Sequence, residues 1–292
     1  MFSLKSEIAI IGAGRVSYSL ANALVKSDFK VSSIISKRIS SAKYFAKKYK
    51  IKNYSSDLNS LSPDVTIFFL AVPDSQILPV AQEIAKLNLD FKKSLFIHLS
   101  GAEDISPLNI LKRKGTCTAS FHIMQTFSER KTIDLKHSYA SVETNNKKAA
   151  DFLFRFAKKL NLYPFKISSK KKVYYHIAGV YASNFLVANQ FYTEQLFGKA
   201  KRGMNYKKIF DPIIKKTFEN IEKHNVLNAI SGPVERGDIK TVRRHIGALK
   251  KDKTLRSNYI CQSLTLLEVI RKRDKGLSAL HRNLKNYLVE LL

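Results

Sequence analysis

Two glycines close to the start of the chain have the spacing of an anion-binding turn. Gly12 and Gly14 follow the apolar run Glu7–Ile11, which predicts a buried strand, and precede Val16–Lys26, which predicts a helix. In such a unit, glycines permit a tight turn and a close approach to a ligand, and the N–H groups that begin the helix attract negative charge. Ser17 replaces the usual third glycine but is still small enough for close helix packing. The pattern predicts a site for the pyrophosphate of a dinucleotide, made by Gly12, Ala13, Gly14, Arg15 and Val16. A turn that binds nothing is the alternative.

The residues after the second predicted strand distinguish between two related dinucleotides. Proteins that bind NAD usually carry Asp or Glu about 20 residues beyond the glycines, where the carboxylate holds the ribose 2′-hydroxyl. This chain has no carboxylate there; Ser36, Lys37 and Arg38 instead offer donors and positive charge to a 2′-phosphate. The run therefore favours NADP(H) as cofactor. A solvated basic loop is the alternative.

Further candidate residues follow other predicted strands at the edge of the sheet where ligands bind in open α/β folds. Ala71, Val72 and Pro73 end one strand and are expected to line the cofactor site. Ser100 follows the next strand and could hydrogen-bond the nicotinamide ribose or a substrate carbonyl. An ordinary turn serine is an equally good interpretation of Ser100.

His122, at the end of a third strand, is the main candidate for acid–base chemistry. An imidazole titrates near neutral pH and can protonate the oxygen formed when a hydride reaches a carbonyl. Gln125 could donate a hydrogen bond to the same oxygen. A histidine bonded to the backbone near a domain junction is the alternative.

Two candidates come from the second half of the chain. Val173–Phe197 predicts one long helix, on which His176 and Asn184 share a face, so Asn184 is a candidate site residue. Arg236 precedes a helix that Asp238 is placed to cap, and its guanidinium could bind a substrate carboxylate. Core packing for Asn184 and a well-capped surface helix for Arg236 are the alternatives.

The elements that must position these residues change in kind along the chain. Short apolar runs alternate with helical patterns up to about residue 168, which predicts a doubly wound α/β sheet of the Rossmann type. Beyond the basic run Lys170–Lys172 every pattern is helical. We therefore expect a dinucleotide-binding domain at residues 1–168 and an all-helical domain at 169–292.

Composition narrows the class of protein. The formal net charge is +28, but the lysines are spread along the chain without a basic tail, so a nucleic-acid partner is not favoured. No apolar run approaches the ~18 residues of a membrane span, and the first residues lack the apolar core of a signal peptide. Cys117 and Cys261 are distant in sequence and lack metal-ligand spacing. We expect a cytoplasmic protein without a metal site.

Several stretches of the chain, in the same order as in the family, resemble an uncharacterised family of proteins. In that family an NADP-oxidoreductase-like Rossmann domain precedes a helical domain of unknown function, domain-of-unknown-function family 2520. The stretches are Gly12–Val16, Ala71–Asp74, His98–Ala102, Phe121–Phe127, Tyr175–Asn184 and Gly232–His245. The family is distantly similar to pyrroline-5-carboxylate reductase and 6-phosphogluconate dehydrogenase. Related dehydrogenases contact substrate through a polar residue, often Lys or Asn, on the first helix of the second domain, which implies that Asn184 orients the substrate. In the hydroxyacid dehydrogenases among them a lysine stands where this chain has Val180, which argues against that activity. The resemblance implies the fold, NADP binding and a homodimer formed through a helical domain like that of 6-phosphogluconate dehydrogenase.

The expected function is an NADP(H)-dependent oxidoreductase that acts on a carbonyl or imine of a small anionic metabolite. In this hypothesis His122 is the acid, Ser100, Gln125 and Asn184 orient the substrate, and Arg236 holds its negative group. The alternative is a protein that binds NADPH without turnover, as a sensor or scaffold.

Overall fold

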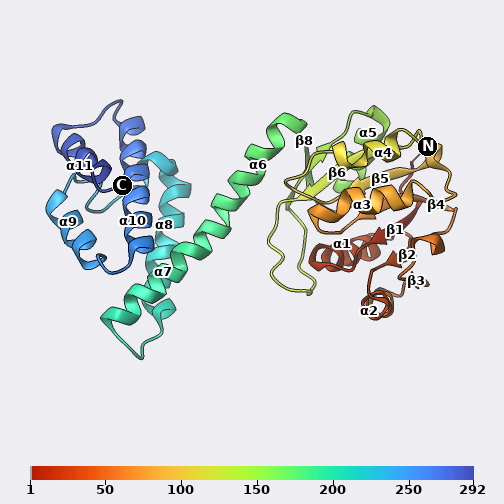
Figure 1. The fold of residues 1–292 in the computed structure, drawn as a ribbon, viewed down its shortest axis with the longest axis horizontal. Helices are drawn as coiled ribbons and strands as arrows, with labels where there is room; N and C mark the ends of the chain where they lie inside the picture. The colour runs from red at the N-terminus through yellow and green to blue at the C-terminus, as the bar shows by residue number, and fades with distance from the viewer. Residues whose placement is uncertain (1) are drawn as a thin grey trace. The chain divides into compact units, whose positions relative to one another are not determined.

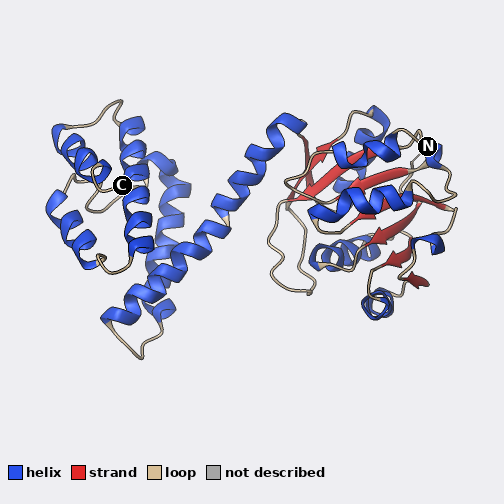
Figure 2. Cartoon of the chain, in the orientation of Figure 1, coloured by secondary structure: helices blue, strands red, loops and turns tan. Residues whose placement is uncertain are grey.

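The computed structural model describes residues 2–292, which form two compact units, 1–186 and 187–292. The first unit is built on a sheet, whereas the second is entirely helical (Figures 1 and 2). Helix α6 (Ser169–Ala182), which the sequence assigns to the helical domain, is part of the first unit.

The sheet has eight strands in the order β3-β2-β1-β4-β5-β6-β7-β8. Neighbouring strands are parallel except for β6 and β7, which are joined by residues 124–138 without a helix. Such a connection suits an antiparallel pair, because parallel neighbours need a crossover. The strands are β1 (Glu7–Ile11), β2 (Val31–Ile35), β3 (Asn53–Ser55), β4 (Val65–Leu70), β5 (Leu95–His98), β6 (Cys117–Ile123), β7 (Tyr139–Glu143) and β8 (Tyr163–Lys166).

Helices cover both faces of this sheet (Figure 1). One core contains residues of α1 (Arg15–Lys26), α2 (Ile39–Tyr49) and α5 (Lys147–Lys159), and the other contains residues of α3 (Asp74–Ile84) and α4 (Asn109–Lys112). Short 3₁₀ turns lie at Leu58–Ser60, Phe91–Lys93 and Ser106–Leu108. The predicted doubly wound Rossmann-type sheet is confirmed.

Strand β1 shows why the sequence is continuously apolar rather than alternating. Ile8 and Ile10 belong to one core, and Ala9 and Ile11 to the other. Successive side chains of a strand point to opposite faces, so a strand covered on both sides must be apolar at every position.

The second unit contains the helices α7 (Asn184–Ala200), α8 (Tyr206–Asn228), α9 (Ile239–Ala248), α10 (Lys253–Arg273) and α11 (Ala279–Val289), of which α7 begins within the first unit. Its core is made by the last three helices and the turn before them, with Val242, Ile260 and Leu284 at most 1% exposed. Neither α7 nor α8 buries a side chain.

The prediction of one helix over Val173–Phe197 is wrong. The helix stops at Ala182 and α7 starts at Asn184, because Ser183 has φ −125° and ψ −66°. Serine and asparagine both have side chains that compete with helical hydrogen bonds, which weakens the helix at this point.

No helix within residues 2–292 combines the length and the apolar character needed to cross a membrane.

Candidate active site

Gly12 is required by the turn that ends β1. Its φ is +111°, which favours glycine, and a Cβ at this position would lie 2.2 Å from the carbonyl oxygen of Ala71. Its N–H donates to Ile35 O at 2.7 Å, and its carbonyl accepts a 2.6 Å hydrogen bond from Ser17 Oγ. The turn is thus held between β2, β4 and α1. Ser17, which replaces the usual third glycine, stabilises the turn through its hydrogen bond to Gly12.

Gly14 leaves the start of α1 open to an anion. It is the N-cap residue in an extended conformation, and no side chain caps the helix. The first turn contains no acidic residue. Because the first N–H groups of a helix have no partner within it, they are available to a negatively charged ligand. The turn therefore fits a dinucleotide pyrophosphate.

The predicted 2′-phosphate residues lie at the same edge of the sheet, directly after β2. Ser36 N donates to Ser55 O at 3.0 Å, which holds the loop against the end of β3. Lys37 and Arg38 are exposed, and Arg38 is the N-cap of α2. The loop Ser36–Arg38 carries positive charge and no carboxylate that would repel a 2′-phosphate.

A cavity of about 380 Å³ lies beside the glycine turn. It brings together eight of the predicted residues: Gly14, Arg15, Val16, Ala71, Val72, Pro73, Ser100 and His122. The other residues that line it are Asp74, Leu99, Gly101, Ile123, Phe127 and His176. Residues from the ends of β4, β5 and β6 thus share one hollow with the N-terminus of α1.

His122 contacts α6 through Tyr175. Its Nδ1 lies 3.0 Å from Tyr175 Oη, and the two rings are almost perpendicular, with centroids 5.6 Å apart. Its Nε2 lies against the backbone of Gly101, where a Cβ would approach to 2.7 Å. Gly101 is therefore needed for the imidazole to occupy its place.

His122 is uncharged at neutral pH. Burial, followed by the positive charges of Lys172 and His176, lowers the pKa of His122 to about 4. The premise that this histidine titrates near neutral pH is therefore wrong. When Tyr175 donates to Nδ1, the neutral ring carries its proton on Nε2. In this tautomer His122 is a hydrogen-bond donor at Nε2 rather than a cation.

Ser100 stabilises a turn as well as lining the cavity. Its Oγ accepts hydrogen bonds from Ala102 N at 3.1 Å and Glu103 N at 2.9 Å. Both interactions leave the hydroxyl proton free to be donated. The two interpretations of Ser100 that the sequence left open are therefore compatible.

Three of the predicted catalytic residues do not line this cavity. Gln125 uses its Oε1 to accept from Thr126 N at 2.9 Å. Asn184 is exposed and begins α7 beyond the break at Ser183, so it does not share a continuous helical face with His176. Arg236 is exposed in the second unit.

The predicted N-cap in the second unit is confirmed. Asp238 caps α9, accepting from Thr241 N at 3.0 Å and from Thr241 Oγ1 at 2.7 Å. These hydrogen bonds lower the pKa of Asp238, so its carboxylate stays charged.

Gly101, which follows Ser100 at a predicted strand end, and Tyr175, to which the sequence assigns no role in the site, both shape the surroundings of His122. Gly101 and Tyr175 each lie within a stretch that carries the family resemblance, but neither residue type suggests chemistry by itself. Only the fold brings Gly101, from the loop after β5, and Tyr175, from α6, against His122 on β6.

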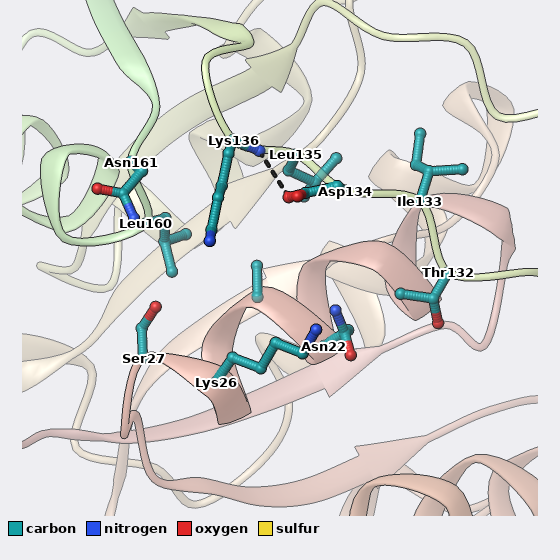
Figure 3. A pocket seen from close by; sticks show the side chains of 11 residues that line it. Asn22, Lys26, Ser27, Thr132, Ile133, Asp134, Leu135, Lys136, Leu160 and Asn161 are labelled. Atoms are coloured by element: carbon teal, nitrogen blue, oxygen red, sulfur yellow. Dashed lines mark hydrogen bonds between the residues drawn. The ribbon is translucent and has the colours of Figure 1, made fainter.

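A larger cavity of about 650 Å³ has a different character (Figure 3). It is lined by Asn22, Ala23, Lys26, Ser27, Thr132, Ile133, Asp134, Leu135, Lys136, Leu160 and Asn161. Its lysines and Asp134 are exposed, and none of the predicted site residues reaches it. Within the described residues 2–292, no group of three His, Cys, Asp or Glu side chains could hold a metal ion. The smaller cavity is therefore the candidate active site.

Family models match both parts of the chain: a Rossmann-like domain at residues 3–123 and a domain of unknown function, DUF2520, at residues 138–265. No curated protein matches the sequence.

Solved structures share the fold over most of the chain. A Bacteroides fragilis protein, provisionally assigned as an NADP oxidoreductase, has 23% identity and a TM-score of 0.77, covering 90% of this chain and 98% of that one. A reductive aminase from Aspergillus terreus, in complex with NADPH and ethyl levulinate, has 10% identity and a TM-score of 0.67, covering 97% and 99%. Pyrroline-5-carboxylate reductase from Coxiella burnetii has 17% identity and a TM-score of 0.53, covering 94% and 100%.

Proposed function

We propose that this chain, a Rossmann-like domain followed by a DUF2520 domain, is an NADP(H)-dependent oxidoreductase that acts on a carbonyl or imine group of a small anionic metabolite. The observation that supports this most is the convergence of the open α1 N-terminus and His122 on one cavity of about 380 Å³. The reductive aminase, which has a related fold, was solved in complex with NADPH. The Bacteroides protein, whose fold is also related, is provisionally assigned as an NADP oxidoreductase.

The residues that would hold the cofactor are those of the glycine turn and the basic loop. The α1 N-terminus would accept the pyrophosphate, and Lys37 and Arg38 would bind the 2′-phosphate. When bound, the nicotinamide supplies or accepts a hydride. Val16, Leu99 and Phe127 provide apolar wall in the cavity, which limits the access of water.

The proposed role of His122 is to donate a hydrogen bond from Nε2 to the oxygen or nitrogen of the substrate. A neutral imidazole can polarise such a group without carrying a full charge. Tyr175 holds Nδ1 and so orients the ring. Ser100, which lines the same cavity, would donate its hydroxyl proton to this group. Gln125, Asn184 and Arg236 are no part of this arrangement in the first unit, and their roles stay predictions.

The proposal is tested by two measurements on the purified protein. NADPH binding is titrated first, by fluorescence or calorimetry, with NADH as the comparison. Oxidation of NADPH is then followed against a panel of keto acids and cyclic imines. We expect tighter binding of NADPH than of NADH and turnover with at least one anionic carbonyl or imine. No measurable affinity for either nucleotide would overturn the proposal.

A protein that binds NADPH without turnover is the second candidate. It is supported by the low pKa of His122, about 4, which makes the imidazolium a rare species at neutral pH. Tight NADPH binding with no oxidation across the whole panel would favour this candidate.

We also propose that the protein is a cytoplasmic homodimer associated through its helical part. Helices α7 and α8 bury no side chain, although both are rich in apolar residues. Helices of this composition need a partner surface. A second copy of the chain presents the same apolar helices, so it is the simplest partner for them. Two free cysteines agree with a reducing compartment.

A further inference from the structure

Lys172 on α6 is a fully buried charge in the first unit. Its side chain is 1% exposed, and that of Glu143, whose carboxylate lies 3.2 Å from Nζ, is 4% exposed. Nζ also donates a hydrogen bond to Ser120 Oγ. The second carboxylate oxygen of Glu143 accepts from Ser169 Oγ at 2.6 Å and from Ile105 N at 3.2 Å. The cluster joins β6, β7, α6 and the loop after β5.

Stability alone is a poor explanation for this pair. Removing two charges from water costs about as much as their attraction returns, so apolar residues of similar volume usually serve a core equally well. A buried pair next to a candidate active site is more informative, since such pairs commonly set the charge state and position of functional groups.

Two short connections link Lys172 to His122. Along β6, Ser120 stands two residues before His122, on the same side of the strand, and its Oγ also donates to Ser100 O at 3.4 Å. Along α6, Tyr175 stands one turn after Lys172 and contacts His122 Nδ1. The lysine therefore fixes both elements that hold the imidazole.

We propose that Lys172 is a positioning residue of the candidate active site: paired with Glu143, it anchors α6 to the end of β6 and sets the position and electrostatic environment of His122. This inference rests on the proposed function only for the use made of His122, because the contacts themselves involve no cofactor.

The electrostatic part of the proposal has a definite direction. The positive charge of Lys172 adds to burial in lowering the pKa of His122 to about 4, and His176 on α6 contributes in the same sense. His98, at the end of β5, responds likewise: burial first and Lys172 second lower its pKa to about 3. The charge of Lys172 thus acts in the same direction on both imidazoles and disfavours their protonated forms.

The charges of three carboxylates oppose the effect of burial on the pKa of Lys172. Burial lowers the pKa of Lys172, and Glu143 from β7 opposes this most strongly. Asp104 from the loop after β5 and Asp74 from α3 act in the same direction as Glu143. Glu143, the direct partner of Lys172, therefore balances most of its charge.

The test is a titration of His122 by NMR in the protein without nucleotide, with the His122 signal assigned by its absence from His122→Gln. Lys172→Met removes the charge and keeps the volume of the side chain. We expect the titration midpoint of His122 to rise by roughly 1 in Lys172→Met, the size of effect that a neighbouring charge produces. Lys172→Arg, which keeps the charge, should restore a low midpoint.

Lys171→Met is the matched control, because it removes the same charge from an exposed position one residue away. It should leave the midpoint unchanged. If Lys172→Met does not fold, the double variant Lys172→Met with Glu143→Gln leaves no unpaired buried charge and carries the same expectation. An unchanged midpoint in the folded variant overturns the proposal, and so does an equal rise in Lys171→Met. NADPH affinity of the wild-type protein is measured separately, so a failure of the proposed function is distinguishable from a failure of this one.

Discussion

Gly12 is constrained by its neighbours before any ligand arrives. The sequence motif assigns this glycine to a tight turn and Gly14 to the close approach of a pyrophosphate. In the structure the first constraint on Gly12 is internal: its φ is positive, and the Ala71 carbonyl lies where a Cβ would be. Gly12 thus belongs to a ligand-binding motif, but the packing of the protein alone already requires a glycine at this position.

Replacement of Gly12 by alanine tests this packing role. We expect Gly12→Ala to destabilise the first unit by more than about 2 kcal/mol, because backbone must move to admit the new methyl group. Thermal unfolding of the protein without nucleotide measures the effect. The control is Gly198→Ala on α7, where nothing lies within 4 Å, and we expect it to stabilise by about 0.5–1 kcal/mol. A wild-type melting temperature in Gly12→Ala would refute the argument.

His98 predicts acid sensitivity of the fold. Burial is the main cause of its low pKa, about 3 in the folded protein, whereas an unfolded chain titrates near 6.5. Below pH 6.5 the unfolded state binds a proton that the folded state does not, so stability is lost as the pH falls toward 3. The loss from this group is roughly 4–5 kcal/mol across that window, and His122 adds to it in the same direction.

Urea unfolding at a series of pH values measures this loss. His98→Asn retains an acceptor for Ser100 N, which now donates to Nδ1 at 3.3 Å, and cannot titrate. We expect the variant to have a shallower dependence of unfolding free energy on pH between 6.5 and 4. His137→Asn, at an exposed histidine of the same unit, should keep the wild-type slope. Equal slopes in all three proteins would contradict the prediction.

At the scale of elements, the strands were more predictable than the connections between helices. A strand buried on both faces must be continuously apolar, and this condition makes β1 and β4 recognisable in the sequence. The break at Ser183 is hard to recognise in the sequence, since a serine within an apolar-rich run is compatible with a continuous helix. The face that His176 and Asn184 are predicted to share depends on that continuity.

The candidate site was predictable where it depends on local turns and not where it depends on tertiary contacts. The glycine turn and the ends of β4, β5 and β6 follow from strand order and motif. The neutral state of His122 depends on burial and on Lys172, which is fifty residues away in the sequence. The contact of His122 with Tyr175 on α6 also joins residues that are distant in the sequence. No local pattern contains that information.

The loop between β2 and α2 predicts a preference between two cofactors. Arg38→Asp replaces an exposed cation by a carboxylate at the expected 2′-phosphate position. We expect the affinity for NADPH to fall at least about tenfold, through loss of an ion pair and new repulsion, while the affinity for NADH changes little. Lys47→Asp, at the other end of α2, is the control for the change of charge. Equal losses for both nucleotides would remove the 2′-phosphate role from Arg38.

At the scale of the whole molecule, the distribution of apolar side chains is more informative than the net charge of +28. The buried apolar residues of the first unit form two cores, one on each face of the sheet, although α6 exposes Val173, Tyr174, Ile177 and Tyr181. In the second unit α9, α10 and α11 share a core, but on α7 and α8 large side chains are exposed: Val187, Phe191, Leu196, Ile209, Ile213, Phe218 and Val226. A monomer would leave these surfaces in water at a large cost in free energy.

Association through these helices makes stability depend on concentration. Binding of a second copy stabilises only the folded state, so the melting temperature should rise with protein concentration. Val187→Glu with Phe191→Glu introduces charge at side chains that are 68% and 55% exposed in the single chain. We expect this double variant to sediment as a monomer and to lose the concentration dependence, because a charge buried in an apolar interface has no partner there. Gln195→Glu adds a charge at an exposed polar position of the same helix and should remain dimeric. A wild-type protein that sediments as a monomer at micromolar concentration would show instead that α7 and α8 are covered by another partner.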